Sequence, residues 1–205
     1  MNQTDIPRKE ITGVILAGGR AQRMGGIDKG LMLLNGKPMV EHVIAALRAE
    51  IDSLLINANR NLEQYAAFGY PVVPDIMDGY LGPLAGMASG MRACVTRYIV
   101  TAPCDSPLVA NNLVRRLYET LTREGADISV AHDGERMHPV FALMRRDLLP
   151  DLLEYLNAGE RKIDRWYARH RLAVAYFRDA PECFRNVNSP QERAELESAL
   201  EVTHR

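Results

Sequence analysis

Short apolar runs alternate with segments of helical periodicity along most of this chain. The run at residues 11–16 is short enough for one buried strand and is followed by a glycine pair. In the segment 38–50, apolar residues recur every three or four positions, which is the spacing of an amphipathic helix that begins at Pro38. Strands that alternate with helices in this way favour a parallel sheet in an α/β domain.

The same pattern predicts further elements in both halves of the chain. The expected strands are residues 11–16, 54–56, 70–73, 98–101, 128–131, 139–144 and 172–177. The expected helices are residues 38–50, 84–93, 108–121, 148–156 and 163–168, and a last one with a capping-box pattern at 189–192. A polar turn joins strands 128–131 and 139–144, so we expect a hairpin that adds an antiparallel element to a mostly parallel sheet.

Glycine or polar residues follow each of the first four expected strands. They are the Gly18-Gly19 pair, Asn57, Asp75 and Asp105. Ligands of parallel α/β sheets bind beyond the carboxyl ends of the strands. We therefore expect these four strand ends to converge on a single site.

The turn at residues 17–19 has the features of a phosphate-binding loop. Glycines allow close approach of the backbone, and their N–H groups can bind an anion. Basic residues follow at Arg20, Arg23 and Lys29, together with a second glycine pair at residues 25–26. Backbone donors surrounded by cations suit a polyanion, so the first hypothesis is a triphosphate.

Two better-known phosphate loops do not fit this turn. The P-loop pattern requires a second glycine where this chain has Arg23 or Met24. The dinucleotide fingerprint requires a glycine where this chain has Arg20.

The composition is that of an ordinary globular protein. The chain has 205 residues, of which 47% are hydrophobic and 25% are charged, and a net charge of −1. We expect one domain over residues 1–205 that binds neither nucleic acid nor membranes. No apolar run approaches the roughly 18 residues of a transmembrane helix, and no apolar stretch near the start resembles a secretory signal. The three cysteines show no CxxC spacing, so we expect reduced thiols in a cytoplasmic protein.

Asp105 is a candidate ligand of Mg²⁺ because it follows a buried strand. Magnesium prefers one or two carboxylates together with phosphate oxygens. The alternative is that Asp105 caps the helix expected after Pro107. Lys29 offers a point charge to a phosphate, whereas Arg20 and Arg23 can each contact two oxygens. The alternative for these three residues is a solvated basic loop.

Asn57 and Asp75 carry donors and acceptors that suit a base edge or a ribose. Asp75 can accept from the N1–H and the amino group of guanine in a two-point contact. The alternative is that Asp75 initiates a turn. The chain has neither a GxSxG elbow nor a Cys–His signature, and its five histidines lack metal-ligand spacing. The residues therefore give no support to covalent catalysis.

One long motif and several shorter ones resemble a known family. Residues 16–39, LAGGRAQRMGGIDKGLMLLNGKPM, are similar to the N-terminal motif LAGG-x-x-x-RMG-x-DK of the nucleotidyltransferases. The shorter motifs are NANR (57–60), GPLAGM (82–87), PCD (103–105), HDGER-x-HP (132–139), LEYLNAGERK (153–162) and NVNSPQE (186–192). These later motifs most resemble those of the molybdenum cofactor guanylyltransferases.

This resemblance implies a three-layer, Rossmann-like nucleotidyltransferase fold and a specific reaction. The terminal phosphate of molybdopterin, which carries molybdenum, would attack the α-phosphorus of GTP, and pyrophosphate would leave. A nucleotide-binding half is expected at about residues 11–106 and a molybdopterin-binding half at about residues 107–200. Transient contacts are expected with proteins that deliver molybdopterin and with those that mature molybdoenzymes.

The resemblance also assigns roles to residues. Asp105 would hold Mg²⁺, and the expected catalytic residues are Arg23, Lys29 and Asp105. The expected nucleotide-binding residues are Leu16, Ala17, Gly18, Gly19, Lys29, Asn57, Asp75, Gly82 and Asp105. The expected molybdopterin-binding residues are Arg136, His138, Asn186 and Asn188.

Two alternative functions remain open on the sequence. The first is molybdopterin cytidylyltransferase or another NTP transferase, which would share the glycine turn. The second is a non-catalytic carrier of molybdenum cofactor, although a carrier has no need for both Lys29 and Asp105. The chain departs from the commonest family pattern at Ala21-Gln22, where many relatives have serine. The backbone amides of the loop remain available to phosphate.

Overall fold

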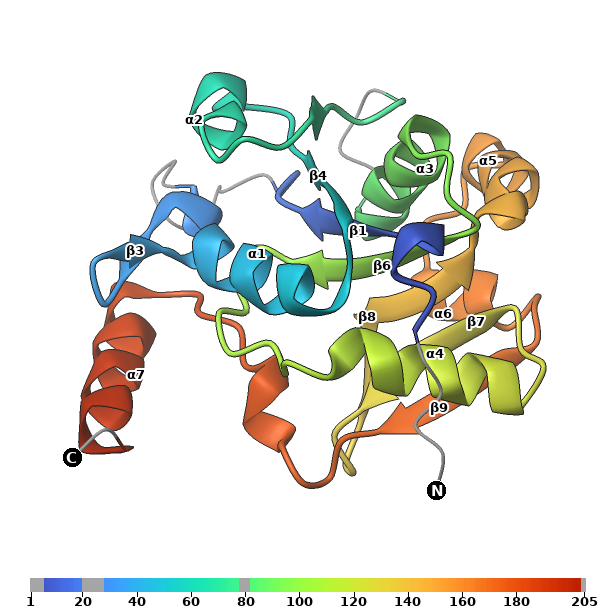
Figure 1. The fold of residues 1–205 in the computed structure, drawn as a ribbon. Coiled ribbons are helices and arrows are strands. Elements are labelled where there is room, and N and C mark those ends of the chain that lie inside the picture. The colour runs from blue at the N-terminus through green and yellow to red at the C-terminus, as the bar shows by residue number, and fades with distance from the viewer. Residues whose placement is uncertain (1–5, 20–27, 78–81, 204–205) are drawn as a thin grey trace.

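The computed structural model describes residues 6–19, 28–77 and 82–203 of the 205-residue chain. Within these residues, the strands form a seven-stranded sheet in the order β5-β4-β1-β6-β8-β7-β9 and a separate two-stranded hairpin of β2 and β3 (Figure 1). The strands are β1 (Ile11–Leu16), β2 (Leu33–Leu34), β3 (Lys37–Pro38), β4 (Ser53–Asn57), β5 (Val72–Val73), β6 (Tyr98–Pro103), β7 (Ile128–His132), β8 (Met137–Arg145) and β9 (Leu172–Tyr176).

Helices connect most of these strands. The α-helices are α1 (Met39–Glu50), α2 (Leu62–Ala66), α3 (Pro83–Ala93), α4 (Leu113–Arg123), α5 (Leu149–Asn157), α6 (Ile163–Tyr167) and α7 (Pro190–Thr203). Short 3₁₀ helices include η3 (Lys29–Leu31) and η5 (Pro181–Phe184). None of the described helices is both long and apolar enough to cross a membrane.

The direction of β8 determines which residues reach the edge of the sheet where the site was expected. β1 lies between β4 and β6 and is parallel to both, whereas β8 runs antiparallel to both β6 and β7. The first residues of β8 therefore lie at the edge where the parallel strands end. This confirms the predicted α/β fold with a mostly parallel sheet and an antiparallel element.

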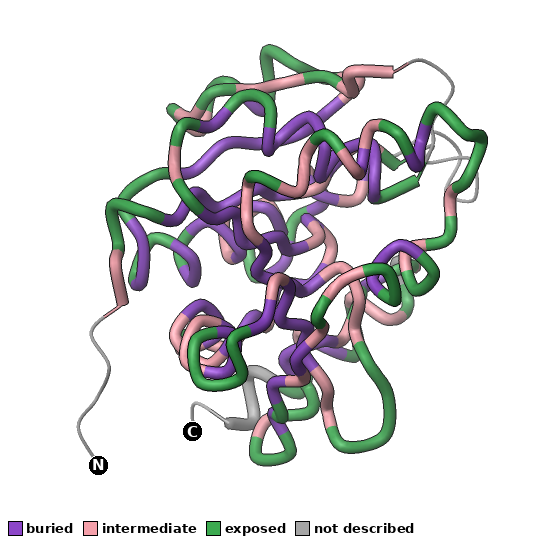
Figure 2. The backbone as a smooth tube through the Cα atoms, turned by 90° about the vertical axis from the view of Figure 1, so that its right-hand side faces the viewer, coloured by how far each residue is buried: buried purple, intermediate pink, exposed green. Residues whose placement is uncertain are grey.

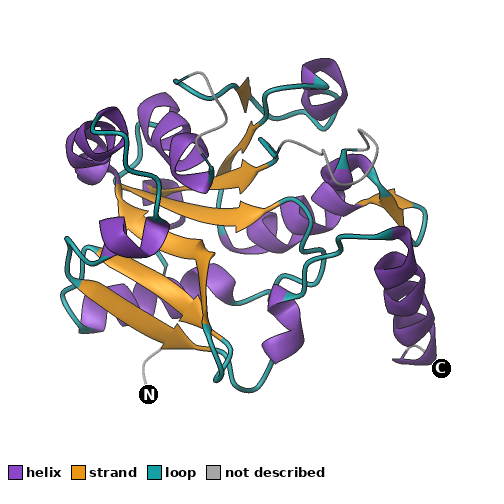
Figure 3. Cartoon of the chain, turned by 180° about the vertical axis from the view of Figure 1, so that it is seen from behind, coloured by secondary structure: helices purple, strands orange, loops and turns teal. Residues whose placement is uncertain are grey.

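Helices cover both faces of the sheet, so the fold has three layers (Figure 3). Helices α1 and α4 pack on one face against side chains such as Ile15 and Val100. Helices α3, α5 and α6 pack on the other face against side chains such as Val14 and Ile99. Successive residues of a strand point to opposite faces, which explains why neighbours in β1 and β6 belong to different core clusters. The buried positions run through the middle of the molecule (Figure 2).

Two helices differ from the sequence prediction. The helix expected over 108–121 begins only at Leu113, because the apolar residue Val109 is buried within an irregular segment and mimics helical periodicity. The single-turn helix α2 was not predicted. Its one buried residue is Tyr65, so its sequence carries no apolar period to detect.

A buried carboxylate joins α1 to the start of α4. Glu50 is 7% exposed, and its two oxygens accept hydrogen bonds from the backbone N–H groups of Val114 and Arg115 at 2.8 and 2.9 Å. Asn112, the N-cap residue of α4, makes no capping bond with its side chain, so Glu50 replaces it from another helix. Burial raises the pKa of Glu50, although these two N–H donors oppose that shift.

We expect Glu50→Ala to lower the free energy of unfolding by about 1–3 kcal/mol, because two backbone N–H groups at the start of α4 lose their acceptor. Urea unfolding followed by circular dichroism measures this loss. The matched control is Glu63→Ala in α2, where the glutamate is exposed and the change should stay within about 0.5 kcal/mol. Equal losses in the two variants would contradict the assigned role of Glu50.

Candidate active site

The glycine turn after β1 packs against the end of β4. The N–H of Ala17 donates to the carbonyl of Asn57 at 2.8 Å, and Asn59 Nδ2 donates to the carbonyl of Gly18 at 3.4 Å. A Cβ at position 18 would lie 3.1 Å from Asn59 Nδ2 and 3.2 Å from Asn57 Oδ1. Glycine at this position therefore allows the turn to approach both asparagine side chains closely.

The carboxylate of Asp75 is held by these two asparagines. Asn57 Nδ2 donates to Asp75 Oδ1 at 2.9 Å, and Asn59 Nδ2 donates to Asp75 Oδ2 at 2.8 Å. The backbone N–H of Asp75 in turn donates to Asn59 Oδ1 at 2.8 Å. Each carboxylate oxygen has more than one lone pair, so Asp75 can accept further hydrogen bonds while its orientation is fixed.

Asn57 is buried, at 2% exposure. Its Nδ2 also donates to the carbonyl of Val73 at 3.2 Å, which ties β4 to the end of β5. A Cβ on Gly86 of α3 would lie only 2.3 Å from Asn57 Oδ1, so the helix packs directly on this amide. The contacts of Asn57 therefore position Asp75.

Lys29 lies between two anchored residues. Asp28 is 7% exposed and accepts hydrogen bonds from the Tyr65 hydroxyl at 2.6 Å and from Asn61 Nδ2 at 3.0 Å. Burial raises the pKa of Tyr65, which keeps its hydroxyl protonated as a donor. On the other side of Lys29, Gly30 packs closely on Tyr65, because a Cβ at position 30 would lie only 2.5 Å from the Tyr65 hydroxyl oxygen. Because both neighbours face the core, the Lys29 side chain extends toward the end of β6.

The Lys29 ammonium bridges Asp105 and Asn188. Its Nζ lies 3.2 Å from Asp105 Oδ2 and 2.5 Å from Asn188 Oδ1. The side chains of Lys29 and Asp105 are 27% and 15% exposed, so their ion pair is partly shielded from water. An ammonium has three N–H donors, and these contacts use two of them.

The segment that carries Asn186 and Asn188 is fixed by the valine between them. Val187 is fully buried in a small cluster with residues that include Leu34, Met39 and Leu196 of α7. Its N–H donates to the carbonyl of Asp105 at 2.8 Å. These contacts hold the segment against the end of β6 and explain the N-V-N pattern of the sequence.

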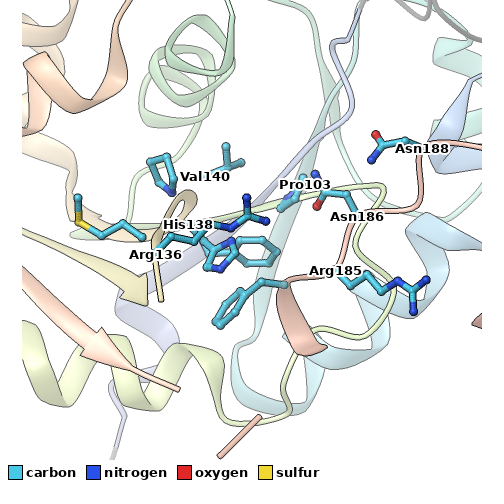
Figure 4. A pocket seen from close by; sticks show the side chains of 11 residues that line it. Pro103, Arg136, His138, Val140, Arg185, Asn186 and Asn188 are labelled. Atoms are coloured by element: carbon cyan, nitrogen blue, oxygen red, sulfur yellow. The ribbon is translucent and has the colours of Figure 1, made fainter. Parts of the chain in front are cut away.

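A pocket of about 440 Å³ lies beside this segment (Figure 4). The lining residues are Pro103, Arg136, Met137, His138, Pro139, Val140, Phe141, Phe184, Arg185, Asn186 and Asn188. They come from the end of β6, from β8 with the turn before it, and from η5 with the segment that joins it to α7. All four residues predicted to bind molybdopterin thus line one pocket, which also reaches Lys29 through Asn188.

His138 is held in this pocket by a carboxylate and an aromatic ring. Its Nε2 lies 2.6 Å from Asp133 Oδ2, and its ring stacks on Phe184 with centroids 4.4 Å apart and planes at 17°. Asp133 Oδ1 accepts hydrogen bonds from the N–H groups of Glu135 and Arg136 at 2.7 and 2.8 Å. The Arg136 N–H and the His138 side chain hold the pKa of Asp133 well below its usual range. Asp133 is therefore an anion that fixes both the turn and the histidine.

The structure brings the predicted residues together around the end of β1. Leu16 pairs in register with Asn57 on one side and with Pro103 on the other, so it lies between the Asp75 group and the Asp105 group. Gly19 is exposed beside the turn, and Gly82 precedes α3 with a φ of 78°. Arg23 lies outside the described residues. The binding and catalytic roles of these residues stay predictions.

Sequence reasoning did not select several residues that shape these sites. They are Asn59, Ser106, Asp133 and Phe184. Asn59 was detectable, because it follows Asn57 by two positions and leaves the same strand end. Ser106 donates to Asn186 Oδ1 at 2.5 Å, and this contact spans 80 positions of the sequence. No local sequence pattern indicated Phe184, because it acts by stacking on His138, which is distant in the sequence.

The cysteines of the chain are free and buried. Burial raises the pKa of the Cys104 thiol, and the Asp105 charge adds to that shift. Burial likewise raises the pKa of Cys183 to about 11 and raises that of Cys94. All three sulfurs are therefore thiols at neutral pH and poor nucleophiles. The groups that face the site instead suit the binding and orientation of phosphates and a base.

Comparisons with known proteins identify relatives over nearly the whole chain. The family model of the MobA-like NTP transferase domain matches residues 13–174. A molybdenum cofactor guanylyltransferase of Shewanella sediminis (strain HAW-EB3) is 48% identical over 191 residues, which cover 93% of this chain and 97% of that protein. A second one, of Shewanella loihica, is 48% identical over the same shares of the two chains.

A solved structure shares the fold. Molybdopterin-guanine dinucleotide biosynthesis protein A from Archaeoglobus fulgidus superimposes with a TM-score of 0.76 at 21% identity, over 93% of this chain and 99% of that chain. At that identity the likeness concerns the fold alone. The family match and the close relatives carry the assignment further: this chain belongs to the MobA-like NTP transferase family and, within it, to the molybdenum cofactor guanylyltransferases.

Proposed function

We propose that this protein transfers GMP from GTP to the terminal phosphate of molybdenum-loaded molybdopterin. The products are molybdopterin guanine dinucleotide, still carrying molybdenum, and pyrophosphate. The names of the curated relatives support this reaction, and the proposal places it at the edge where β1, β4, β5 and β6 end. Molybdenum is part of the substrate.

One observation carries the proposal. The Lys29 ammonium contacts both Asp105, in the half expected to bind the nucleotide, and Asn188, which lines the pocket in the half expected to bind molybdopterin. In this reaction the α-phosphate of GTP must meet the acceptor phosphate at one point. A cation that contacts residues from both parts of the chain supports the proposal that the two phosphates meet beside Lys29.

The chemistry of the reaction matches these residues. The acceptor phosphate is already an anion, so its oxygen can attack the α-phosphorus without a general base. The bond from the α-phosphorus to the bridging oxygen breaks, and its electron pair leaves with pyrophosphate. Transfers of this kind depend on positioning and on stabilising charge, which Lys29 and the backbone N–H groups of the glycine turn can supply.

The donors around Asp105 suit Mg²⁺. Within residues 6–19, 28–77 and 82–203, no three His, Cys, Asp or Glu side chains meet as a metal cage. Magnesium is commonly held by one or two carboxylates plus substrate phosphates, which matches one aspartate at a phosphate site. Asp105 would hold the ion, and Mg²⁺ there would supply positive charge near the leaving pyrophosphate.

Separate groups select the base and hold the acceptor. Asp75, fixed by Asn57 and Asn59, can accept from the N1–H and the amino group of guanine. The pocket with Arg136, His138, Asn186 and Asn188 would hold molybdopterin, since it offers cationic and amide donors beside an aromatic wall. A cytoplasmic location and transient contacts with molybdopterin-delivering and molybdoenzyme-maturing proteins belong to the same proposal.

The nucleotide preference tests the reaction directly. With Mg²⁺ and nucleotide at a hundred times the dissociation constant, GTP should raise the melting temperature by about 5–10 °C, and CTP at the same concentration by much less. Pyrophosphate should be released from GTP only when molybdopterin is present. A larger shift with CTP would overturn the choice of base, and absence of release with active cofactor would favour a carrier.

Asp105→Ala should reduce turnover about a hundredfold or more, because it removes the proposed metal ligand and the partner of Lys29. Guanosine affinity should change by less than about twofold, since the base contacts are elsewhere. Single-turnover kinetics and calorimetry with guanosine measure the two effects. An equal loss of guanosine binding would place Asp105 in the base site instead.

Asn188→Ala should weaken molybdopterin binding by about two- to tenfold, as expected for one lost hydrogen bond, and should spare GTP binding. Asn157→Ala, at an exposed position that ends α5, is the matched control. Equilibrium titration with each substrate separates the effects. Unchanged molybdopterin affinity in Asn188→Ala would remove this residue from the acceptor site.

A further inference from the structure

Asn59 joins the ends of three neighbouring strands with one carboxamide. It leaves the end of β4, and its Nδ2 contacts the Gly18 carbonyl after β1 and Asp75 Oδ2 after β5. Its Oδ1 accepts the backbone N–H of Asp75 at 2.8 Å. Asn59 therefore binds Asp75 by two bonds, one to the main chain and one to the carboxylate.

The hydrogen bonds from Asn57 and Asn59 to the two carboxylate oxygens fix the plane of the Asp75 carboxylate. Asn57 holds Oδ1 and Asn59 holds Oδ2, so rotation of the carboxylate would break at least one hydrogen bond. With Asn59 removed, Oδ2 would lose its donor and the carboxylate could turn about its bond to Oδ1. A two-point contact depends on both acceptors being fixed, whereas a single contact survives such rotation.

Asn59 is a better probe of this arrangement than Asn57. Asn57 is 2% exposed and packs on α3, so its removal would leave a cavity and unpaired groups in the core. Asn59 is only partly buried, so water can replace its lost contacts. A change at Asn59 thus alters the orientation of Asp75 with less effect on the core.

We propose that Asn59 is a positioning residue that sets base selectivity by holding Asp75 for a two-point contact. The base class it favours has two adjacent donors on one edge, which guanine presents as N1–H and the 2-amino group. Inosine lacks the 2-amino group and offers one of these donors. This inference rests on the proposed function, because it takes GTP as the nucleotide bound at this edge.

The test compares equilibrium binding of GTP and ITP, with Mg²⁺, to the full chain and its variants. Asn59→Asp keeps the size of the side chain and an acceptor for the Asp75 N–H, but lacks the Nδ2 donor. Asn59→Ala removes both contacts. Asn111→Asp is the matched control, because this asparagine is exposed in the segment before α4. The readout is the ratio of the dissociation constants for ITP and GTP. Any repulsion of the triphosphate by a new carboxylate affects both nucleotides and leaves this ratio unchanged.

The full chain and Asn111→Asp should bind GTP about tenfold or more tightly than ITP, as expected for a hydrogen bond to a charged group. In both Asn59 variants this preference should fall to about threefold or less, and in Asn59→Ala the ITP affinity should change by less than about threefold. Circular dichroism checks folding, and Asn59→Asp carries the test if Asn59→Ala does not fold.

Three results would overturn the inference, and they differ from a failure of the proposed function. The Asn59 variants could keep the full GTP preference, or Asn59→Ala could lose GTP and ITP equally, which would indicate a purely structural role. The unmodified chain could also bind GTP and ITP equally, which would remove the two-point contact itself. Absence of GTP binding to the unmodified chain would instead reject the proposed function.

Discussion

The ion pair between Lys29 and Asp105, extended to Asn188, is the contact on which the arrangement of the site depends. Its three side chains come from distant parts of the sequence, and each is positioned by a buried neighbour. Asp28 anchors Lys29, and Val187 anchors Asn188. The polar groups need few contacts of their own for positioning, because the core fixes the residues next to them. The remaining donors and acceptors of Lys29, Asp105 and Asn188 are therefore available to a ligand.

The topology of the sheet brings two kinds of chemistry to one edge. The parallel strands β1, β4, β5 and β6 deliver the glycine turn, Asn57, Asp75 and Asp105. The reversed strand β8 then begins at the same edge, so Arg136 before it and His138 within it line the pocket beside Asn188. A parallel strand at that position would have placed its first residues at the opposite edge.

The elements and site residues that follow from local sequence patterns could be predicted, whereas those that depend on contacts between distant residues could not. The buried strands were visible as apolar runs, and their ends indicated Asn57, Asp75 and Asp105. The start of α4 was misplaced because buried Val109 continues the apolar period ahead of the helix, and the residue that caps α4, Glu50, belongs to another helix. The stacking of Phe184 on His138 joins segments with no common local signal. The approach of Lys29 to Asn188 likewise exists only after folding. The predicted acceptor residues came from resemblance to a family, and the pocket that they line was not predictable from spacing.

The groups proposed to read the base and those proposed to bind phosphate are attached to different strands. Asn57, Asn59 and Asp75 belong to the ends of β4 and β5, whereas Lys29 and Asp105 follow β1 and β6. Base selection can therefore change through side chains at the β4 and β5 ends without displacing the phosphate-binding groups. For this reason, the fold alone does not determine which nucleotide is bound. Under the proposal, the choice of base depends on how firmly Asn57 and Asn59 hold the Asp75 carboxylate, and these side-chain hydrogen bonds are not determined by the strand order.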